Sequence, residues 1–269
     1  MAESVARSST TSASSGAKRR VSKSAEKADP AGGRARKERS AELLYQQLFH
    51  ELARVAEMSL VERRLREAGF RSIAGTDEVG RGCLAGPVVA ACVILDGDGT
   101  IVGVNDSKQI SHPDRLEVCR SIMSRARAVA VGIVEPRIID RINILEATKL
   151  AMYDAVENLP VRPDVLLLDA VLVESLEMPQ IPLIRGDRRS VSIAAASIVA
   201  KVYRDLLMES YHVRYPVYDF VNNRGYGTES HWAALRTYGP SPIHRRSFEG
   251  VTEPMLLFGR GTKDGGSER

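Results

Sequence analysis

The chain has 269 residues, of which 43% are hydrophobic and 27% are charged, as is typical of a globular protein. Its longest apolar run is far shorter than the ~18 residues of a membrane-spanning helix, and the N-terminus has no apolar secretory signal. Its three cysteines, Cys83, Cys92 and Cys119, lack the spacing of a disulfide framework or a zinc site. We therefore expect a cytoplasmic protein with reduced thiols that makes no contact with a membrane.

The net charge of +4 is concentrated at the N-terminus. Residues 1–40 hold ten Lys and Arg and four acidic residues, so they carry +6 and the rest of the chain carries −2. A basic segment rich in Ser, Ala and Gly without hydrophobic periodicity is typical of disorder. We expect residues 1–39 to be a disordered basic arm, which either has no partner or contacts phosphate groups.

Residues 40–69 are expected to form a helical lead-in to the main domain. Leucines recur there at helical spacing, and Ser59 with Glu62 has the pattern of a capping box that opens a second helix. The main domain is expected over residues 70–250. Residues 251–269 are rich in glycine and charge, which predicts a flexible tail.

Within the main domain, strands come early and helices late. Apolar runs predict strands over residues 72–76, 88–95, 101–104, 128–134 and 165–168. Helical patterns cover residues 113–124, 143–158, 190–208 and 230–238. This order predicts an α/β fold with a mixed β-sheet flanked by helices and a C-terminal helical region.

Acidic residues stand at the ends of two predicted strands. Asp77 and Glu78 close the first strand, and Asp169 follows an apolar strand. One such acid is commonly an ordinary turn residue. Carboxylates that converge from separate strands are costly to bury unless a cation compensates them, and their oxygens suit Mg²⁺ or Mn²⁺.

A glycine loop, Gly80-Arg81-Gly82, follows the first pair of acids. Glycines present backbone N–H groups and allow a ligand to approach closely, although tight turns use them equally often. The loop lacks the spacing of a Walker or Rossmann motif, which argues against those nucleotide-binding classes.

Taken together, the motifs resemble the ribonuclease HII family. The resembling segments are Ala74–Gly82, Ala85–Val89, Asp106–Lys108, Ile142–Thr148, Leu168-Asp169, Gly186-Asp187, Ser192–Lys201, Gly225–Thr228 and Pro242–Phe248. They span roughly residues 70–250 in the order and spacing of the family. The resemblance implies an RNase H-like fold in residues 70–250, which would be the catalytic domain.

The resemblance also implies an activity and a cofactor. It implies an endoribonuclease that hydrolyses the RNA strand of RNA–DNA hybrids and cuts 5′ of ribonucleotides embedded in duplex DNA, leaving a 3′-hydroxyl and a 5′-phosphate. Asp77, Glu78, Asp169 and Asp187 would be its catalytic residues and would bind Mn²⁺ or Mg²⁺ for hydrolysis by two metal ions. From the residues alone, Asp187 also fits a surface ion pair with the arginines around it.

By the same resemblance, Gly80, Arg81 and Gly82 would hold the ribonucleotide through its 2′-hydroxyl, the group that distinguishes RNA from DNA. Tyr226 would stack on the next deoxyribose, although it also fits a turn aromatic.

Three further residues are candidates for phosphate contacts: Lys108, Ser197 and Lys201. Ser197 and Lys201 are one helical turn apart and could share a partner, but from the residues alone a serine bonded to its own helix and a solvated lysine are favoured. His231 and His244 are interpreted as structural histidines, since hard oxygen sites do not need imidazole.

Two other classes of function are also weighed. A catalytically silent nucleic-acid-binding protein is disfavoured by the acids, which repel phosphate without metals. An RNase H-like nuclease acting on DNA alone is disfavoured by the glycine loop and Tyr226. We expect a monomer, and a replication clamp is a candidate partner of the arm.

Overall fold

The computed structural model describes residues 30–97, 101, 103–104 and 111–252, with side chains from Glu42 onward. The chain divides into two units, residues 1–46 and 47–269, and the second contains every predicted site residue. Lys108 lies outside the described residues. Among the described residues, no helix is both long enough and apolar enough to cross a membrane.

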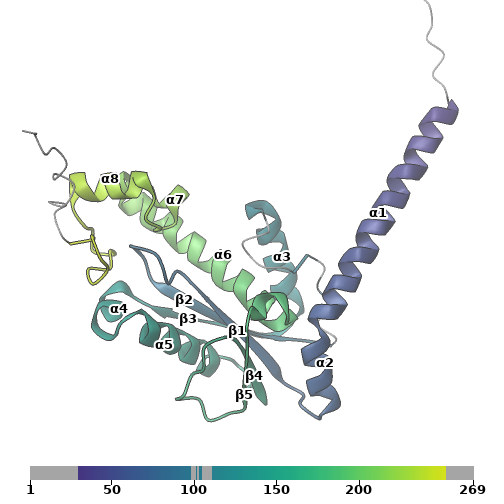
Figure 1. Ribbon diagram of the computed structural model, residues 1–269, viewed down its shortest axis with the longest axis horizontal. Coiled ribbons are helices and arrows are strands. Elements are labelled where there is room, and N and C mark those ends of the chain that lie inside the picture. Colours follow the sequence, from purple (N-terminus) through teal and green to yellow (C-terminus); the bar gives the residue numbers. More distant parts are fainter. Residues whose placement is uncertain (1–29, 98–100, 102, 105–110, 253–269) are drawn as a thin grey trace, which may run out of the picture. The chain divides into compact units, whose positions relative to one another are not determined.

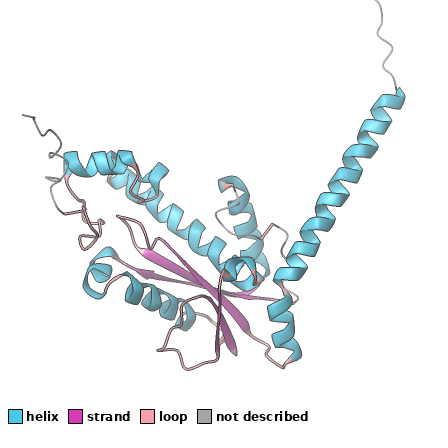
Figure 2. Cartoon of the chain, viewed as in Figure 1, coloured by secondary structure: helices cyan, strands magenta, loops and turns pink. Residues whose placement is uncertain are grey.

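A mixed five-stranded sheet forms the centre of the second unit (Figures 1 and 2). Its strands are β1 (Ile73–Val79), β2 (Val88–Leu95), β3 (Ala126–Val134), β4 (Val165–Asp169) and β5 (Gln180–Leu183), in the order β3-β2-β1-β4-β5. Strands β1, β2 and β3 pair antiparallel, whereas β4 is parallel to β1 and to β5. The predicted mixed α/β sheet is confirmed.

Helices cover both faces of this sheet (Figure 1). The helices are α1 (Pro30–Met58), α2 (Leu60–Glu67), α3 (His112–Arg125), α4 (Pro136–Ile142), α5 (Ile144–Glu157), α6 (Val191–Arg214), α7 (Phe220–Asn223) and α8 (Glu229–Tyr238), with 3-10 turns η1 (Gly186–Arg188) and η2 (Pro216–Tyr218). Helix α5 packs on one face, and α6 with α3 packs on the other.

The approach of α6 to β1 depends on a glycine. A Cβ atom at Gly75 would lie 2.2 Å from the backbone carbonyl carbon of Ser192 in α6. Only a residue without a side chain lets the helix backbone rest on the strand backbone at this point. This contact fixes α6 along the strand that carries Asp77 and Glu78.

The C-terminal part of the second unit has a core of its own. The end of α6 packs with η2, α7 and α8 around Met208, Tyr218, Phe220, Leu235 and Ile243. The predicted C-terminal helical region is therefore confirmed.

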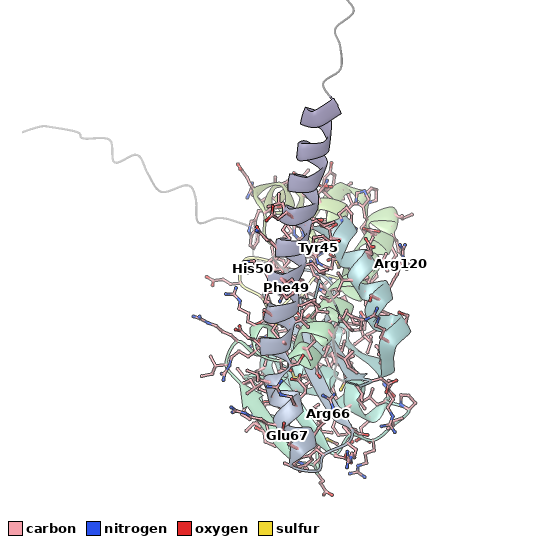
Figure 3. All side chains as sticks on the ribbon, turned by 90° about the vertical axis from the view of Figure 1, so that its right-hand side faces the viewer. Tyr45, Phe49, His50, Arg66, Glu67 and Arg120 are labelled. Atoms are coloured by element: carbon pink, nitrogen blue, oxygen red, sulfur yellow. The ribbon has the colours of Figure 1, made fainter. Side chains whose placement is uncertain are left out.

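The lead-in differs from the expectation in two ways. Helix α1 begins at Pro30, ahead of the predicted start at residue 40, so the prediction of disorder is wrong for residues 30–39, which are helical. Of its apolar residues, Val55 is buried, whereas Leu48 and Leu52 are exposed. The neighbouring side chains of Phe49 and His50 are exposed as well (Figure 3). The periodicity thus predicted the helix but only part of its buried face.

The predicted capping box is wrong. Ser59 makes no side-chain cap to α2, and its hydroxyl donates to the carbonyl of Val55 at 2.9 Å. Glu62 is fully buried and instead accepts from the hydroxyl of Ser190 at 2.5 Å and from the N–H of Ser192 at 3.0 Å. A carboxylate at this position is favoured because the start of α6 carries free N–H groups and a partial positive charge.

Two strand predictions also need correction. The first strand continues through Asp77 and Glu78 to Val79, because these residues pair with Ala91, Ala90 and Val89 of β2. The predicted strand at 101–104 is absent from the residues described there, which form a turn. Its apolar residues Ile101 and Val104 are buried without joining the sheet.

Candidate functional site

Three carboxylates meet at one edge of the sheet. Asp77 and Glu78 lie near the C-terminal end of β1, and Asp169 is the last residue of β4. Because β1 and β4 are parallel and Thr76 pairs with Leu168, Asp77 and Asp169 are at equivalent positions on neighbouring strands. The structure therefore brings these three acids together, and their role as metal ligands stays a prediction.

Asp77 carries most of the electrostatic cost of this arrangement. Its side chain is only 7% exposed. Burial, followed by the negative charge of Glu78, raises the pKa of Asp77 from 3.8 to about 8. A hydrogen bond from Ser197 of α6 opposes this shift, and the charge of Asp169 adds to it. The site thus has an excess of negative charge that a cation would neutralise.

Only one of the two carboxylate oxygens of Glu78 has a partner among the described residues. Its Oε1 atom is 3.2 Å from Arg81 Nη1, in an ion pair whose arginine side chain is 44% exposed. Its Oε2 atom is buried and has no hydrogen-bond partner among the described residues. Burial raises the pKa of Glu78, and the positive charge of Arg81 opposes that change. An unpaired carboxylate oxygen of this kind fits a hard cation.

The fourth predicted acid lies on the neighbouring turn. The N–H of Gly186 donates to Asp169 Oδ1 at 2.9 Å, and Asp187 is the next residue of η1. Among the residues that the structure describes, no three acidic, histidine or cysteine side chains form a ready-made metal site. The donor set of carboxylate oxygens fits a divalent cation in its chemistry.

Two buried arginines lie against the glycine loop: Arg204 packs on Gly80, and Arg245 hydrogen-bonds to the loop carbonyls. Gly80 has φ +94°, and a Cβ atom there would lie 2.2 Å from Arg204 Nε, so only glycine fits. Arg245 donates to the carbonyls of Gly80 at 2.6 Å, Arg81 at 2.8 Å and Gly86 at 3.0 Å. Both arginine side chains are completely buried. These buried side chains therefore fix the conformation of the loop from its interior side.

This anchoring directs the loop amides outward. In a trans peptide, the C=O of one residue and the N–H of the next point in opposite directions. Since the carbonyls of Gly80 and Arg81 point at Arg245, the N–H groups of Arg81 and Gly82 point away from it. Both residues are exposed, and neither amide has a partner in the described part of the chain. The loop thus offers two adjacent donors beside the carboxylates.

The family model for Ribonuclease HII matches residues 74–251 of this chain. The chain belongs to the ribonuclease HII family. Ribonuclease HII of Listeria monocytogenes is 52% identical over 207 residues, which cover 77% of this chain and 79% of that protein. That of Lactobacillus gasseri is 56% identical over 181 residues, which cover 67% and 72%. Membership makes the chain an endoribonuclease with ribonuclease H activity.

A solved structure has the same fold. The ribonuclease H2 of Pyrococcus horikoshii has a TM-score of 0.58 at 26% identity and covers 66% of this chain and 94% of its own. The RNase HII of Archaeoglobus fulgidus, solved in a complex with PCNA, has a TM-score of 0.58 at 25% identity and covers 65% and 95%. The RNase H-like fold implied by the sequence is confirmed.

In this ribonuclease HII family member, Tyr226 lies beside the glycine loop. Its side chain is 42% exposed, and burial, followed by the nearby Cys83, the residue after the loop, raises the pKa of its hydroxyl. The Leu84 N–H also donates to the Gly225 carbonyl at 2.8 Å. The structure therefore brings Tyr226 and the loop together, as a shared substrate contact requires.

The candidate phosphate-binding residues do not share a partner. Ser197 hydrogen-bonds to Asp77, and Lys201 Nζ donates to Asp205 Oδ1 at 2.7 Å, one turn further along α6. Ser197 is buried at the carboxylate edge, so it acts on Asp77 directly. Lys201 is half-buried in its ion pair.

Sequence reasoning missed the buried Arg204. Arg204 donates to the carbonyls of Pro87 at 3.0 Å, Arg224 at 2.8 Å and Ala85 at 3.1 Å. Arginine is ordinarily a surface residue, so its pattern gives little warning of such a role. The available signal was its place at the end of the small, apolar side of the 190–208 helix.

Proposed function

We propose that this chain hydrolyses the RNA strand of RNA–DNA hybrids and cuts 5′ of ribonucleotides embedded in duplex DNA. The products would carry a 3′-hydroxyl and a 5′-phosphate. Asp77, Glu78, Asp169 and Asp187 would hold divalent cations, Mn²⁺ or Mg²⁺, of which two would serve hydrolysis. The observation that carries this proposal is the meeting of three carboxylates with an outward-facing glycine loop at one sheet edge.

The cations are supported by the charge of the site. The buried Asp77 feels the charges of Glu78 and Asp169, and Glu78 Oε2 lacks a partner among the described residues. When bound, divalent cations would activate a water molecule and stabilise the negative charge that accumulates at the phosphorus. Ser197 would hold the Asp77 carboxylate in place through its hydrogen bond.

The loop supplies selectivity for ribose. Two N–H donors of Arg81 and Gly82 can reach the 2′-hydroxyl and the adjacent phosphate because no side chain of Gly82 intervenes; a Cβ atom there would meet nothing within 4 Å. Among the side chains that the structure describes, the Arg81 guanidinium pairs with Glu78 alone, and its own side chain is 44% exposed. Such pairs are weak, so Arg81 can exchange the carboxylate for a substrate phosphate when cations occupy the acids. Tyr226 would stack on the neighbouring deoxyribose.

The decisive experiment uses a labelled DNA duplex with one ribonucleotide, an all-DNA duplex and an RNA–DNA hybrid. Each is incubated with Mg²⁺, Mn²⁺ or EDTA, with the wild type and with Asp77→Asn. We expect a metal-dependent cut 5′ of the ribonucleotide and cleavage of the hybrid, both lost in the variant. Cleavage of the all-DNA duplex would instead identify a DNA nuclease, and binding without cleavage would identify a silent binding protein.

We further propose a division of labour along the chain and a partner. Residues 70–250 would be the catalytic domain, with residues 1–39 as a basic arm, 40–69 as a lead-in and 251–269 as a tail. The complex of the Archaeoglobus fulgidus protein with PCNA supports a sliding clamp as a partner. Co-elution of the full chain with a clamp on size exclusion, against a variant lacking residues 1–39, tests the arm and also whether the free chain is a monomer.

A further inference from the structure

Two buried histidines form a direct hydrogen bond beneath Tyr226. His231 lies in the first turn of α8, and His244 lies in the loop that follows this helix. Their Nε2 atoms are 2.9 Å apart, and the rings are 0% and 2% exposed. Tyr218 and Phe220 pack against both rings. The pair belongs to none of the sites described above.

The partners at the two ends determine where the protons lie. Ser241 donates its backbone N–H to His244 Nδ1 at 2.9 Å, and its hydroxyl, which can donate as well, lies 2.8 Å from the same atom, so this nitrogen is the unprotonated acceptor. The proton of His244 is then on Nε2 and is donated to His231 Nε2. The remaining proton of His231 is on Nδ1, which lies 2.8 Å from the Tyr226 carbonyl. The hydrogen bonds therefore run in one direction, from Ser241 to Tyr226, with both rings neutral.

Neutral rings agree with their surroundings. Burial lowers the pKa of His231, while burial and the nearby His231 lower the pKa of His244 to about 3. A charged His244 would place an Nδ1–H against the Ser241 N–H and break the chain of hydrogen bonds at its origin.

This chain of hydrogen bonds from Ser241 through the two histidines, called the histidine relay below, ends at the backbone of Tyr226. The Tyr226 carbonyl accepts from His231 and also from the N–H of Thr228 at 2.8 Å. Its own N–H donates to the Asn223 carbonyl at 2.9 Å. The backbone of Tyr226 is thus fixed on both sides, while its ring stays 42% exposed beside Cys83.

The segment that carries His244 also carries the anchor of the glycine loop. Arg245 holds the carbonyls of Gly80 and Arg81 from beneath. His244 itself forms a β-bridge with Ala85, and the Arg245 N–H donates to the Leu84 carbonyl at 2.9 Å. Two neighbouring residues therefore support the two elements that would grip the substrate.

We propose that His231 and His244 are positioning residues that set Tyr226 for substrate binding and join it to the Gly80–Gly82 loop through Arg245. This inference rests on the proposed function, because it takes Tyr226 to be a substrate contact. It assigns the histidines no proton transfer to the reacting atoms.

The test compares two substitutions at one position. His231→Leu fills the volume but removes the donor to Tyr226, whereas the amide nitrogen of His231→Asn stands where Nδ1 was and restores it. On the duplex with one ribonucleotide, we expect His231→Leu to raise KM by about tenfold with kcat changed by less than about threefold. His231→Asn should recover most of the loss, and His50→Leu, at an exposed histidine of α1, should have no effect.

A double-mutant cycle separates positioning from folding. If His231 acts through Tyr226, His231→Leu should have little further effect on KM in a Tyr226→Ala background. Additive effects of the two substitutions on KM would overturn the proposal. So would a His231→Asn variant whose thermal unfolding shows that it is folded but whose KM is as high as that of His231→Leu.

A structural readout keeps the histidine relay separate from the proposed function. Imidazole ¹H–¹⁵N spectra of the full chain should show protons on Nδ1 of His231 and Nε2 of His244 from pH 6 to 8. The opposite tautomers or a doubly protonated ring in this range would refute the histidine relay even in an enzyme that cuts as proposed. Conversely, an enzyme that cuts no ribonucleotide-containing duplex would refute the proposed function, whatever these spectra show.

Discussion

The cluster of Asp77, Glu78 and Asp169 should make the metal-free protein less stable as the pH rises. The folded state keeps a proton on Asp77 up to about pH 8, whereas the unfolded chain releases it near the ordinary pKa of 3.8. Between these values the folded state binds more protons than the unfolded state, so the free energy of unfolding must fall as the pH increases. Asp77→Asn removes this titration and retains the size of the side chain.

The magnitude follows from the size of the shift. At about 1.4 kcal/mol for each pKa unit, a shift from 3.8 to about 8 gives an upper limit of roughly 6 kcal/mol. Entry of water and relaxation of Glu78 and Asp169 reduce this value, and we expect about one third of it, roughly 2 kcal/mol, to be measured. For a domain of this size, that difference corresponds to about 4–8 °C in Tm.

The assay is thermal unfolding in EDTA at pH 5 and pH 8. Asp77→Asn should be more stable than the wild type at pH 8 and should differ little at pH 5, while Asp96→Asn, at an exposed position after β2, should follow the wild type at both. Added Mn²⁺ should raise the Tm of the wild type at pH 8 more than that of Asp77→Asn. A variant no more stable than the wild type at pH 8 in EDTA would refute the claim that burial and the neighbouring acids raise the pKa of Asp77.

Three further predictions concern the supports of the site. Gly80→Ala should lower the free energy of unfolding by about 2 kcal/mol and abolish cleavage, because Gly80 has a φ of +94° and contacts Arg204. Gly82→Ala, with open space around it, should lose cleavage and keep the Tm of the wild type. A stable and active Gly80→Ala would contradict this prediction. Arg204→Met should lower the free energy of unfolding in urea by about 3 kcal/mol, because three carbonyls, two of them in buried hydrogen bonds, lose this donor; exposed Arg63→Met should lower it by less than about 0.5 kcal/mol. Glu62→Ala should lower the free energy of unfolding by about 1–2 kcal/mol, because α6 loses the carboxylate that caps its first turn. The exposed Glu67→Ala should change it by almost nothing, and equal losses in the two variants would refute the capping role.

The long, strongly patterned elements were predictable from the sequence. The apolar run at residues 88–95 coincides with β2, and the amphipathic pattern at 143–158 contains α5. Strand β5 was missed because it is four residues long, contains Pro182 and pairs with one neighbour only, so it resembles a loop in sequence. Such edge strands form because β4 offers them a partner, and a local pattern does not contain this information.

The acids of the site and the residues that support it also differ in how far the sequence predicted them. Asp77, Glu78 and Asp169 could be placed at one edge because each follows an apolar strand pattern. Asp187 had no such signal, since it lies on a 3-10 turn after the edge strand, and only the family resemblance pointed to it. Arg204 was not predicted because its partners are backbone carbonyls of distant segments, which its residue type does not reveal.

The two halves of the site are stabilised by opposite means. At the acids, like charges are held together by the register of β1 and β4 and by the packing of α6 on Gly75, so the fold opposes their repulsion. At the glycine loop and Tyr226, buried arginines and neutral histidines satisfy the backbone carbonyls and fix the conformation. This arrangement fixes the loop and Tyr226 without substrate, while, on the proposed function, the acids would reach their most favourable state only with cations bound. Removing the metal should therefore weaken the sheet edge and leave the loop and Tyr226 in place.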